Sequence, residues 1–222
     1  MISTIWNRSM KRRSRAVRAP RRFLGVVAVA LLGFASPQPP DAAAQSAPRA
    51  MIQQTIDAVL VVLDDKALST EQKRSRIEEI AYQRFDFPVV SRLVLARDWN
   101  RFSKPQQTAF MEEFKRYLAV NYGNRIERYN QQKVEIVGER QEPRGDVTIQ
   151  SVVHGGEFEG ATIDYRLRQR DGEWLVIDVI VEGISFVSNF RDQFKEVLAR
   201  GGPDELLQKL REKNAAGPAG AS

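Results

Sequence analysis

The sequence predicts an α+β fold in which helices come first, an antiparallel sheet of four strands follows, and helices close the chain. Apolar residues recur at helical spacing through residues 50–129, and from Lys133 to Glu182 the period changes to two. After Ser185 the helical spacing returns. About 165 residues in this order suit a single domain, so one core is expected.

Residues 50–66 are expected to form an amphipathic helix. A second helix should begin after Ser69, because Ser69 and Gln72 have the spacing of a capping box, in which each residue bonds the backbone of the other. A third helical segment covers residues 88–99.

A long apolar helix is expected after residue 102. Ser103 and Gln106 repeat the capping-box spacing, and Pro105 suits a first helical turn. The apolar pattern predicts that this helix reaches Tyr129.

Four strands are expected at residues 133–141, 146–154, 160–169 and 173–181, joined by turn residues into an antiparallel meander. The third strand alternates most clearly, which predicts one buried and one solvated face. Ala161, Ile163, Tyr165 and Leu167 should share the buried face, and Thr162, Asp164, Arg166 and Arg168 the other.

Two helices complete the predicted domain, at residues 185–200 and 203–213. Gly201 suits the C-terminal cap of the first, and Pro203 the start of the second. The segment 214–222 is small and contains Gly and Pro, so a disordered tail is expected.

The N-terminal segment 1–44 has the layout of a secretory signal peptide. A basic stretch precedes the 13-residue apolar run 23–35, and Ala42 and Ala44 supply small residues before a cleavage point at Gln45. The run is short for a membrane span, which needs about 20 apolar residues, although an uncleaved anchor is the alternative. Arg21 and Arg22 leave twin-arginine and general export both open. We therefore expect an exported, soluble protein in the periplasm, with a flexible lead-in at residues 45–50.

Charge argues against a nucleic-acid protein once the leader is set aside. Residues 1–44 hold eight of the 34 basic residues and one of the 28 acidic residues, so 26 basic and 27 acidic residues remain in the rest. A surface that neutralises phosphates needs a basic excess. The absence of Cys excludes disulfides, thiolate metal sites and cysteine nucleophiles.

Enzyme motifs are absent, and neither a catalytic centre nor a cofactor is expected. A lone His154 cannot form a multi-histidine zinc site, and its place beside two glycines suits a surface turn. Asp164 and Asp178 lie on successive strands, where they either form an acid/base pair or serve the polar face and a structural hydrogen bond. An enzyme that uses an Asp and Tyr165 in a cone-shaped pocket for a small hydrophobic substrate is the alternative function.

Apolar and aromatic residues occur in the interior pattern of every predicted element. They form either an ordinary core or the lining of a ligand cavity, and the pattern does not separate the two. The candidate lining residues are Leu93, Phe114, Leu118, Tyr122, Ile149, Ile163, Tyr165, Leu167, Ile177, Val179, Ile184, Val187 and Phe190.

Three arginines follow one face of the third strand and its turn. Arg166, Arg168 and Arg170 either meet an anionic partner or form a solvated face balanced by carboxylates. Arg92 and Arg97 are further candidates for docking.

Three segments, 85–99, 114–129 and 171–213, resemble the MlaC family, also called the toluene-tolerance family, of periplasmic phospholipid-binding proteins. In that family a Trp-x-Val-x-Asp strand leads through Val-Glu-Gly-Ile-Ser into a helix that begins Asn-aromatic-Arg-x-x-aromatic. The matching residues here are Trp174, Val176, Asp178, Val181, Glu182, Gly183, Ile184, Ser185, Asn189, Phe190, Arg191 and Phe194. The resemblance covers residues 51–213.

The resemblance implies a curved antiparallel sheet wrapped by helices around an apolar lipid cavity. It also implies a soluble carrier, expected to be a monomer, that shuttles phospholipid between an outer-membrane lipoprotein and porin complex and the substrate-binding subunit of an inner-membrane Mla ABC transporter. Such a carrier maintains outer-membrane lipid asymmetry. A structural or chaperone-like adaptor, with neither cavity nor ligand, is a third hypothesis.

Overall fold

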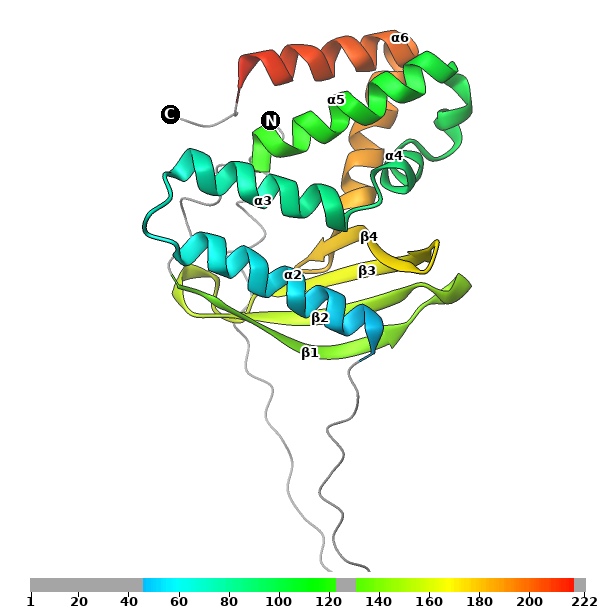
Figure 1. The fold of residues 1–222 in the computed structure, drawn as a ribbon. Coiled ribbons are helices and arrows are strands. Elements are labelled where there is room, and N and C mark those ends of the chain that lie inside the picture. Colours follow the sequence, from blue (N-terminus) through cyan, green and yellow to red (C-terminus); the bar gives the residue numbers. More distant parts are fainter. Residues whose placement is uncertain (1–45, 123–130, 218–222) are drawn as a thin grey trace, which may run out of the picture. The chain divides into compact units, whose positions relative to one another are not determined.

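A computed structural model describes residues 46–122 and 131–217 of the chain. The chain divides after Ser46 into two units, of which the second is the folded domain considered below. Within its described residues, five α-helices accompany an open antiparallel sheet, which confirms the α+β prediction (Figure 1).

The sheet runs in the order β1-β2-β3-β4-β5, with every pair antiparallel. It has five strands, one more than predicted, because the two-residue β5 pairs with the end of β4 and is too short to show alternation in the sequence. The bounds are β1 Lys133–Gln141, β2 Val147–His154, β3 Thr162–Arg170, β4 Glu173–Val181 and β5 Ile184–Ser185. The first and fourth strands match the predicted ranges, and the other two begin one or two residues later.

Two irregularities interrupt the strand pairing. One lies between Ile136 and Gly138 in β1, and the other between Arg166 and Leu167 where β3 meets β4. Bulges of this kind bend a strand and increase its twist. They supply the local geometry that a curved sheet requires.

Both predicted capping boxes are present. Helix α3 (Thr70–Arg84) begins with Ser69 N–H donating to Gln72 Oε1 at 2.9 Å and Gln72 N–H donating to Ser69 Oγ at 3.2 Å. The same pair of bonds, at 2.9 and 3.4 Å, joins Ser103 and Gln106 at the start of α5 (Lys104–Tyr122). The predicted continuation of α5 to Tyr129 falls outside the described residues.

Helix α2 spans Ala47–Asp64, so it starts three residues before the predicted helix and takes in most of the predicted lead-in. The apolar segment predicted at 88–99 divides into α4 (Phe87–Leu95) and a 3₁₀ helix η1 (Ala96–Arg101). The division falls at Ala96, whose backbone leaves the helical region with φ 48°. Two further short 3₁₀ turns, η3 (Pro143–Gly145) and η4 (Gly156–Phe158), connect strands.

The two predicted C-terminal helices form one element, α6 (Phe186–Ala216), with a break inside it. The break is at Gly202 rather than the predicted Gly201, because Gly202 has the positive φ of 70° that only glycine adopts without strain. The helix continues three residues into the predicted tail, where the Asn214 side chain donates to the Glu113 carbonyl at 3.0 Å. Residues 218–222 lie outside the described part.

The core consists of two apolar clusters rather than one. The sheet cluster joins α2 to the inner face of β1–β4 and includes Ile52, Ile56 and Ile149. The helical cluster joins α4, α5 and α6 around Phe110, Phe114 and Phe190. Helix α3 contributes no fully buried residue to either.

Candidate functional site

The predicted alternation of β3 is confirmed by the strand register. Tyr165 lies between Ile149 of β2 and Val179 of β4, and Ile163 lies opposite Val181. Directly paired residues of antiparallel strands point to the same side of a sheet. These residues therefore form one apolar face, which α2 covers with Met51, Ile52 and Ile56.

The thirteen candidate lining residues do not come together on one surface. The sheet cluster contains Ile149, Tyr165, Leu167 and Val179, whereas the helical cluster contains Leu93, Phe114, Leu118, Val187 and Phe190. Ile163, Ile177 and Ile184 belong to neither cluster. The side chain of Tyr122 lies outside the described part of the chain.

Burial separates these candidates into two kinds. One group is closely packed, each member being at most 4% exposed: Phe114, Ile149, Leu167, Ile177, Val187 and Phe190. The other group is only partly buried: Leu93, Leu118, Ile163, Tyr165, Val179 and Ile184. Only the second group offers apolar surface to a ligand without opening a packed cluster.

Helices α2 and α3 add partly buried apolar residues that the sequence did not assign to the site. The later turns of α2 carry Val59, Leu60 and Leu63, and α3 carries Ile77 and Ile80. Their helical spacing was visible in the sequence. It did not identify them as site residues, because the same spacing marks any helix that packs on a core.

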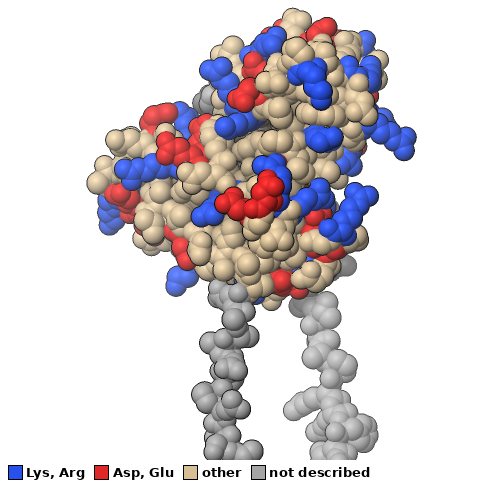
Figure 2. All heavy atoms as spheres, turned by 45° about the vertical axis from the view of Figure 1, so that its right-hand side comes forward, with Lys and Arg blue, Asp and Glu red and all other residues tan. Residues whose placement is uncertain are grey.

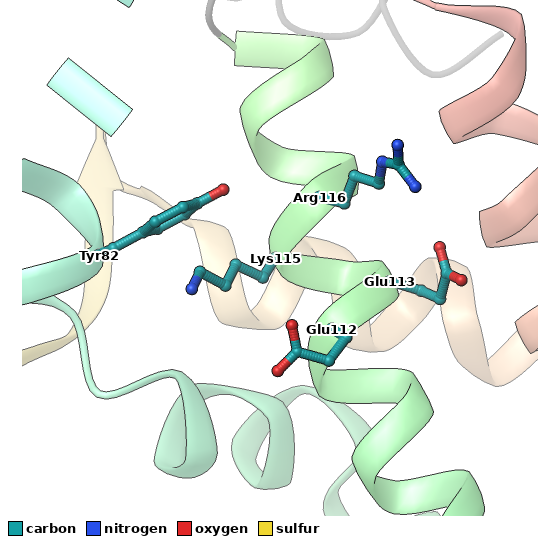
Figure 3. A pocket seen from close by; sticks show the side chains of 5 residues that line it. All are labelled: Tyr82, Glu112, Glu113, Lys115 and Arg116. Carbon is teal, nitrogen blue, oxygen red and sulfur yellow. The ribbon is translucent and has the colours of Figure 1, made fainter. Parts of the chain in front are cut away.

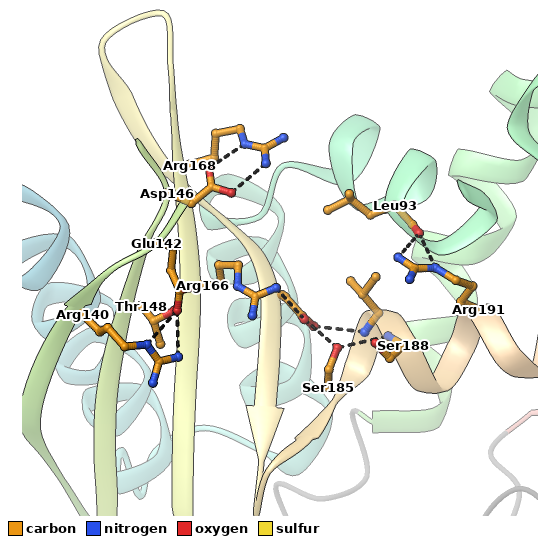
Figure 4. Close-up of polar contacts among 12 residues, drawn as sticks. Leu93, Arg140, Glu142, Asp146, Thr148, Arg166, Arg168, Ser185, Ser188 and Arg191 are labelled. Atoms are coloured by element: carbon orange, nitrogen blue, oxygen red, sulfur yellow. Dashed lines mark hydrogen bonds and ion pairs between the residues drawn. The ribbon is translucent and has the colours of Figure 1, made fainter. Parts of the chain in front are cut away.

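The arginines of β3 lie on the opposite, polar face of the sheet, and each has a carboxylate partner. Figure 4 shows the ion pairs of Arg166 and Arg168. Arg168 binds Asp146 through two hydrogen bonds of 2.7 Å, and Arg170 binds the buried Asp86 at 2.7 Å. Arg166 lies 3.8 Å from Asp178.

Of the two hypotheses for these arginines, the structure supports the face balanced by carboxylates. Acidic and basic side chains are also interspersed over the surface shown in Figure 2. The arginine row is therefore not a free positive strip.

Asp178 makes structural hydrogen bonds rather than belonging to a pair of carboxylates. Its Oδ1 accepts the backbone N–H of Val187 at 3.0 Å, and its Oδ2 accepts the Ser185 hydroxyl at 2.6 Å. Ser185 in turn caps α6 by accepting the Ser188 N–H at 3.1 Å. Asp178 thus fixes the start of α6 on the end of the sheet.

The geometry does not assemble the acid/base centre of the alternative hypothesis. Asp178 lies opposite Arg166, and Asp164 lies opposite Ile180, so the two carboxylates are not direct partners. Tyr165 points to the other face of the sheet, because neighbouring residues of a strand alternate. Burial raises the pKa of Tyr165 to about 12, so its hydroxyl stays protonated at neutral pH.

Asp178→Ala should lower the free energy of unfolding by about 3 kcal/mol, because it leaves the buried Val187 N–H without an acceptor and loosens the cap of α6. Denaturant unfolding at neutral pH measures the change. A loss below about 1 kcal/mol would contradict this structural role.

Asp164→Asn on the same face is the matched control. Burial raises the pKa of Asp164 above its ordinary value of 3.8, so ionisation of this carboxyl costs stability in the folded state. Asn removes that cost, and the variant should be slightly more stable than the wild type at neutral pH. The gain should disappear below pH 3.8, where the carboxyl is protonated in the unfolded chain too.

His154 lies at the end of β2 between two carboxylates. Its Nε2 is 3.0 Å from Glu135 Oε2 and its Nδ1 is 3.3 Å from Glu159 Oε1. The carboxylates sit on opposite sides of the ring, so they do not converge on one point. Across residues 46–122 and 131–217, no group of three His, Asp or Glu side chains is placed to hold a metal ion.

None of the candidate lining residues borders either of two hollows on the surface of the described residues. One, of about 280 Å³, lies between α3 and α5, where Tyr82 and Lys115 point toward each other (Figure 3). Lys115 Nζ sits 3.6 Å from the centre of the Tyr82 ring, in a cation–π contact. Charged side chains supply most of the lining, so this hollow does not suit an acyl chain.

The second hollow, of about 550 Å³, lies where the start of α2, the end of α3 and the start of β4 meet.

No helix among the described residues has the length and hydrophobicity to cross a membrane.

Comparisons with known proteins agree with this architecture. The family described as MlaC protein matches residues 53–212. The toluene tolerance protein ttg2D of Pseudomonas putida is 32% identical over 116 residues, which cover 52% of this chain and 54% of that protein, so the match spans about half of that relative.

A phospholipid-binding protein from Ralstonia solanacearum, solved in complex with a phospholipid, is 24% identical with a TM-score of 0.68. The match covers 75% of this chain and 96% of that one. At this level of identity the likeness shows a shared fold. Because the family match extends over most of the described domain, the chain belongs to the MlaC family.

Proposed function

We propose that this protein is a periplasmic phospholipid carrier that holds the acyl chains of its ligand against the apolar face of the sheet. The observation that carries the proposal is the set of partly buried apolar residues, Ile163, Tyr165, Val179 and Ile184, on a fold shared with a phospholipid-bound protein. Membership of the MlaC family supports it.

The physical requirement on such a carrier is a dry site for two acyl chains. Exposing about 30 methylenes to water costs about 24 kcal/mol, at ~0.8 kcal/mol each. A carrier that meets this requirement needs neither a nucleophile nor a cofactor. Ile163 and Ile184 support the proposal, because they are partly buried and belong to neither cluster, so they offer apolar surface outside the packed core.

The same proposal includes the route of the lipid. The protein receives phospholipid from, or delivers it to, an outer-membrane lipoprotein and porin complex and the substrate-binding subunit of an inner-membrane ABC transporter, and so maintains lipid asymmetry. It acts as a monomer without enzymatic activity. Segment 1–44 directs export and is cleaved off near Ala44. The phospholipid-binding domain, predicted at residues 51–213, then includes all of α2 to α6, from Ala47 to Ala216.

Protein purified from the periplasm without added lipid should carry at least about one phospholipid molecule per chain. Without a ligand, the apolar face of the sheet would be exposed to water. Denaturing extraction followed by mass spectrometry measures the content. A protein refolded from denaturant after delipidation serves as the lipid-free control. Finding no diacyl lipid in the periplasmic protein would contradict the proposal and favour a pocket for a small hydrophobic substrate.

A further inference from the structure

The larger hollow combines three parts of the chain that the sequence did not connect. Ala47 and Met51 come from the start of α2, Gln83 and Arg84 from the end of α3, and residues 173–175 from the start of β4. These segments lie at the same end of the sheet as the β3–β4 turn (Figure 1). Their meeting leaves about 550 Å³ of open space.

One wall of this hollow is apolar and continues into the core. Met51 and Trp174 both belong to the sheet cluster, together with Tyr165 and Val179 of the proposed lipid face. Trp174 is only partly buried and borders the hollow. A ligand at this position can therefore reach the apolar face of the sheet from its end.

The rest of the lining carries two opposite charges that lack ion-pair partners. Among residues 46–122 and 131–217, neither Arg84 nor Glu173 takes part in a salt bridge, although the neighbouring Arg170 pairs with both Asp86 and Asp171. A guanidinium suits a phosphate, because its fork of donors matches the phosphate oxygens. A carboxylate suits an ammonium group.

We propose that this hollow holds the headgroup of the bound phospholipid, with the phosphate at Arg84, the amine of a phosphoethanolamine headgroup near Glu173, and the first methylenes against Met51 and Trp174. The inference rests on the proposed function and adds a location and a headgroup class to it. A volume of about 550 Å³ falls within the range of small-molecule sites and suits a headgroup with its glycerol.

The first experiment compares the lipids that co-purify with charge variants. Arg84→Glu should reduce the total phospholipid per chain by about fivefold, the upper range for a solvent-exposed ion pair. Glu173→Lys should lower the ratio of phosphatidylethanolamine to phosphatidylglycerol by a similar factor. Arg76→Glu and Glu79→Lys, at exposed positions of α3 away from the hollow, are the matched controls and should change neither quantity.

The outcomes separate the two proposals. A wild-type protein without phospholipid would overturn the proposed function itself. A lipid-loaded wild type with unchanged content and headgroup ratio in both Arg84→Glu and Glu173→Lys would overturn the headgroup site alone.

A second measurement uses the position of Trp174. The chain has three tryptophans, Trp6, Trp99 and Trp174, and Trp6 lies in the expected leader. In a Trp99→Phe variant from which the leader has been cleaved, the tryptophan fluorescence therefore comes from Trp174. A spin label near the headgroup of a bound phospholipid should quench it more strongly than a label at the chain end, and the reverse order would overturn the proposal. Millimolar inorganic phosphate should leave the emission unchanged, since a response to phosphate alone would indicate a free-phosphate site.

Discussion

Replacing Ile163 with aspartate should strip the purified protein of phospholipid while leaving it folded. Ile163 is partly buried on the apolar face of the sheet, beside Tyr165, and belongs to neither packed cluster. An unpaired carboxylate against an acyl chain costs several kcal/mol, so lipid affinity should fall at least about 100-fold. Phosphorus per protein chain measures the loss, and thermal unfolding confirms the fold.

Val137→Asp is the matched control, because Val137 is also a β-branched residue of the sheet but is 56% exposed. It should keep the wild-type lipid content. Leu167→Asp and Arg168→Asp are less informative, since Leu167 is fully buried and Arg168 is bonded to Asp146. If Ile163→Asp retained lipid at the level of Val137→Asp, the apolar face of the sheet would not be the lipid surface.

Phe114→Ala should lower the free energy of unfolding by about 3 to 5 kcal/mol. The Phe114 ring is fully buried, and its centre lies 5.2 to 5.4 Å from those of Phe110, Phe190 and Phe194. Removing it leaves a cavity among rings that cannot all move to fill it. Denaturant unfolding measures the loss, which should be smaller in Phe114→Leu because leucine fills more of the space.

The same variant tests whether Phe114 touches lipid, as the sequence predicted, or serves the core. The packing around it favours the core, so folded Phe114→Ala protein should carry as much phospholipid per chain as the wild type. A variant of nearly unchanged stability that has lost its lipid would show instead that the residue lines the binding site.

Local signals in the sequence were sufficient for most of the fold. The capping boxes at Ser69 and Ser103 formed as predicted, because each depends on residues only three positions apart. The strands from Lys133 to Val181 also followed from their alternation. In contrast, the pairing of Arg170 with Asp86 joins residues 84 positions apart, and no local pattern predicts it.

The candidate site was harder to predict than the fold. Phe114 and Ile163 both occupy apolar positions of a periodic pattern, yet one is packed among aromatic rings and the other is partly open. Whether an apolar residue fills a core or borders a site depends on how distant elements meet. Arg84 and Glu173 carried no signal at all, because single charges at the ends of elements are common.

The segment after Gly202 has a consequence for how the chain matures. Leu206, Leu207 and Leu210 complete the helical cluster, although they come from the last part of the described sequence. Because synthesis proceeds from the N-terminus, this cluster cannot close until Leu210 has been added to the chain. Until then the rings of Phe110, Phe114 and Phe190 lack part of the packing that shields them from water.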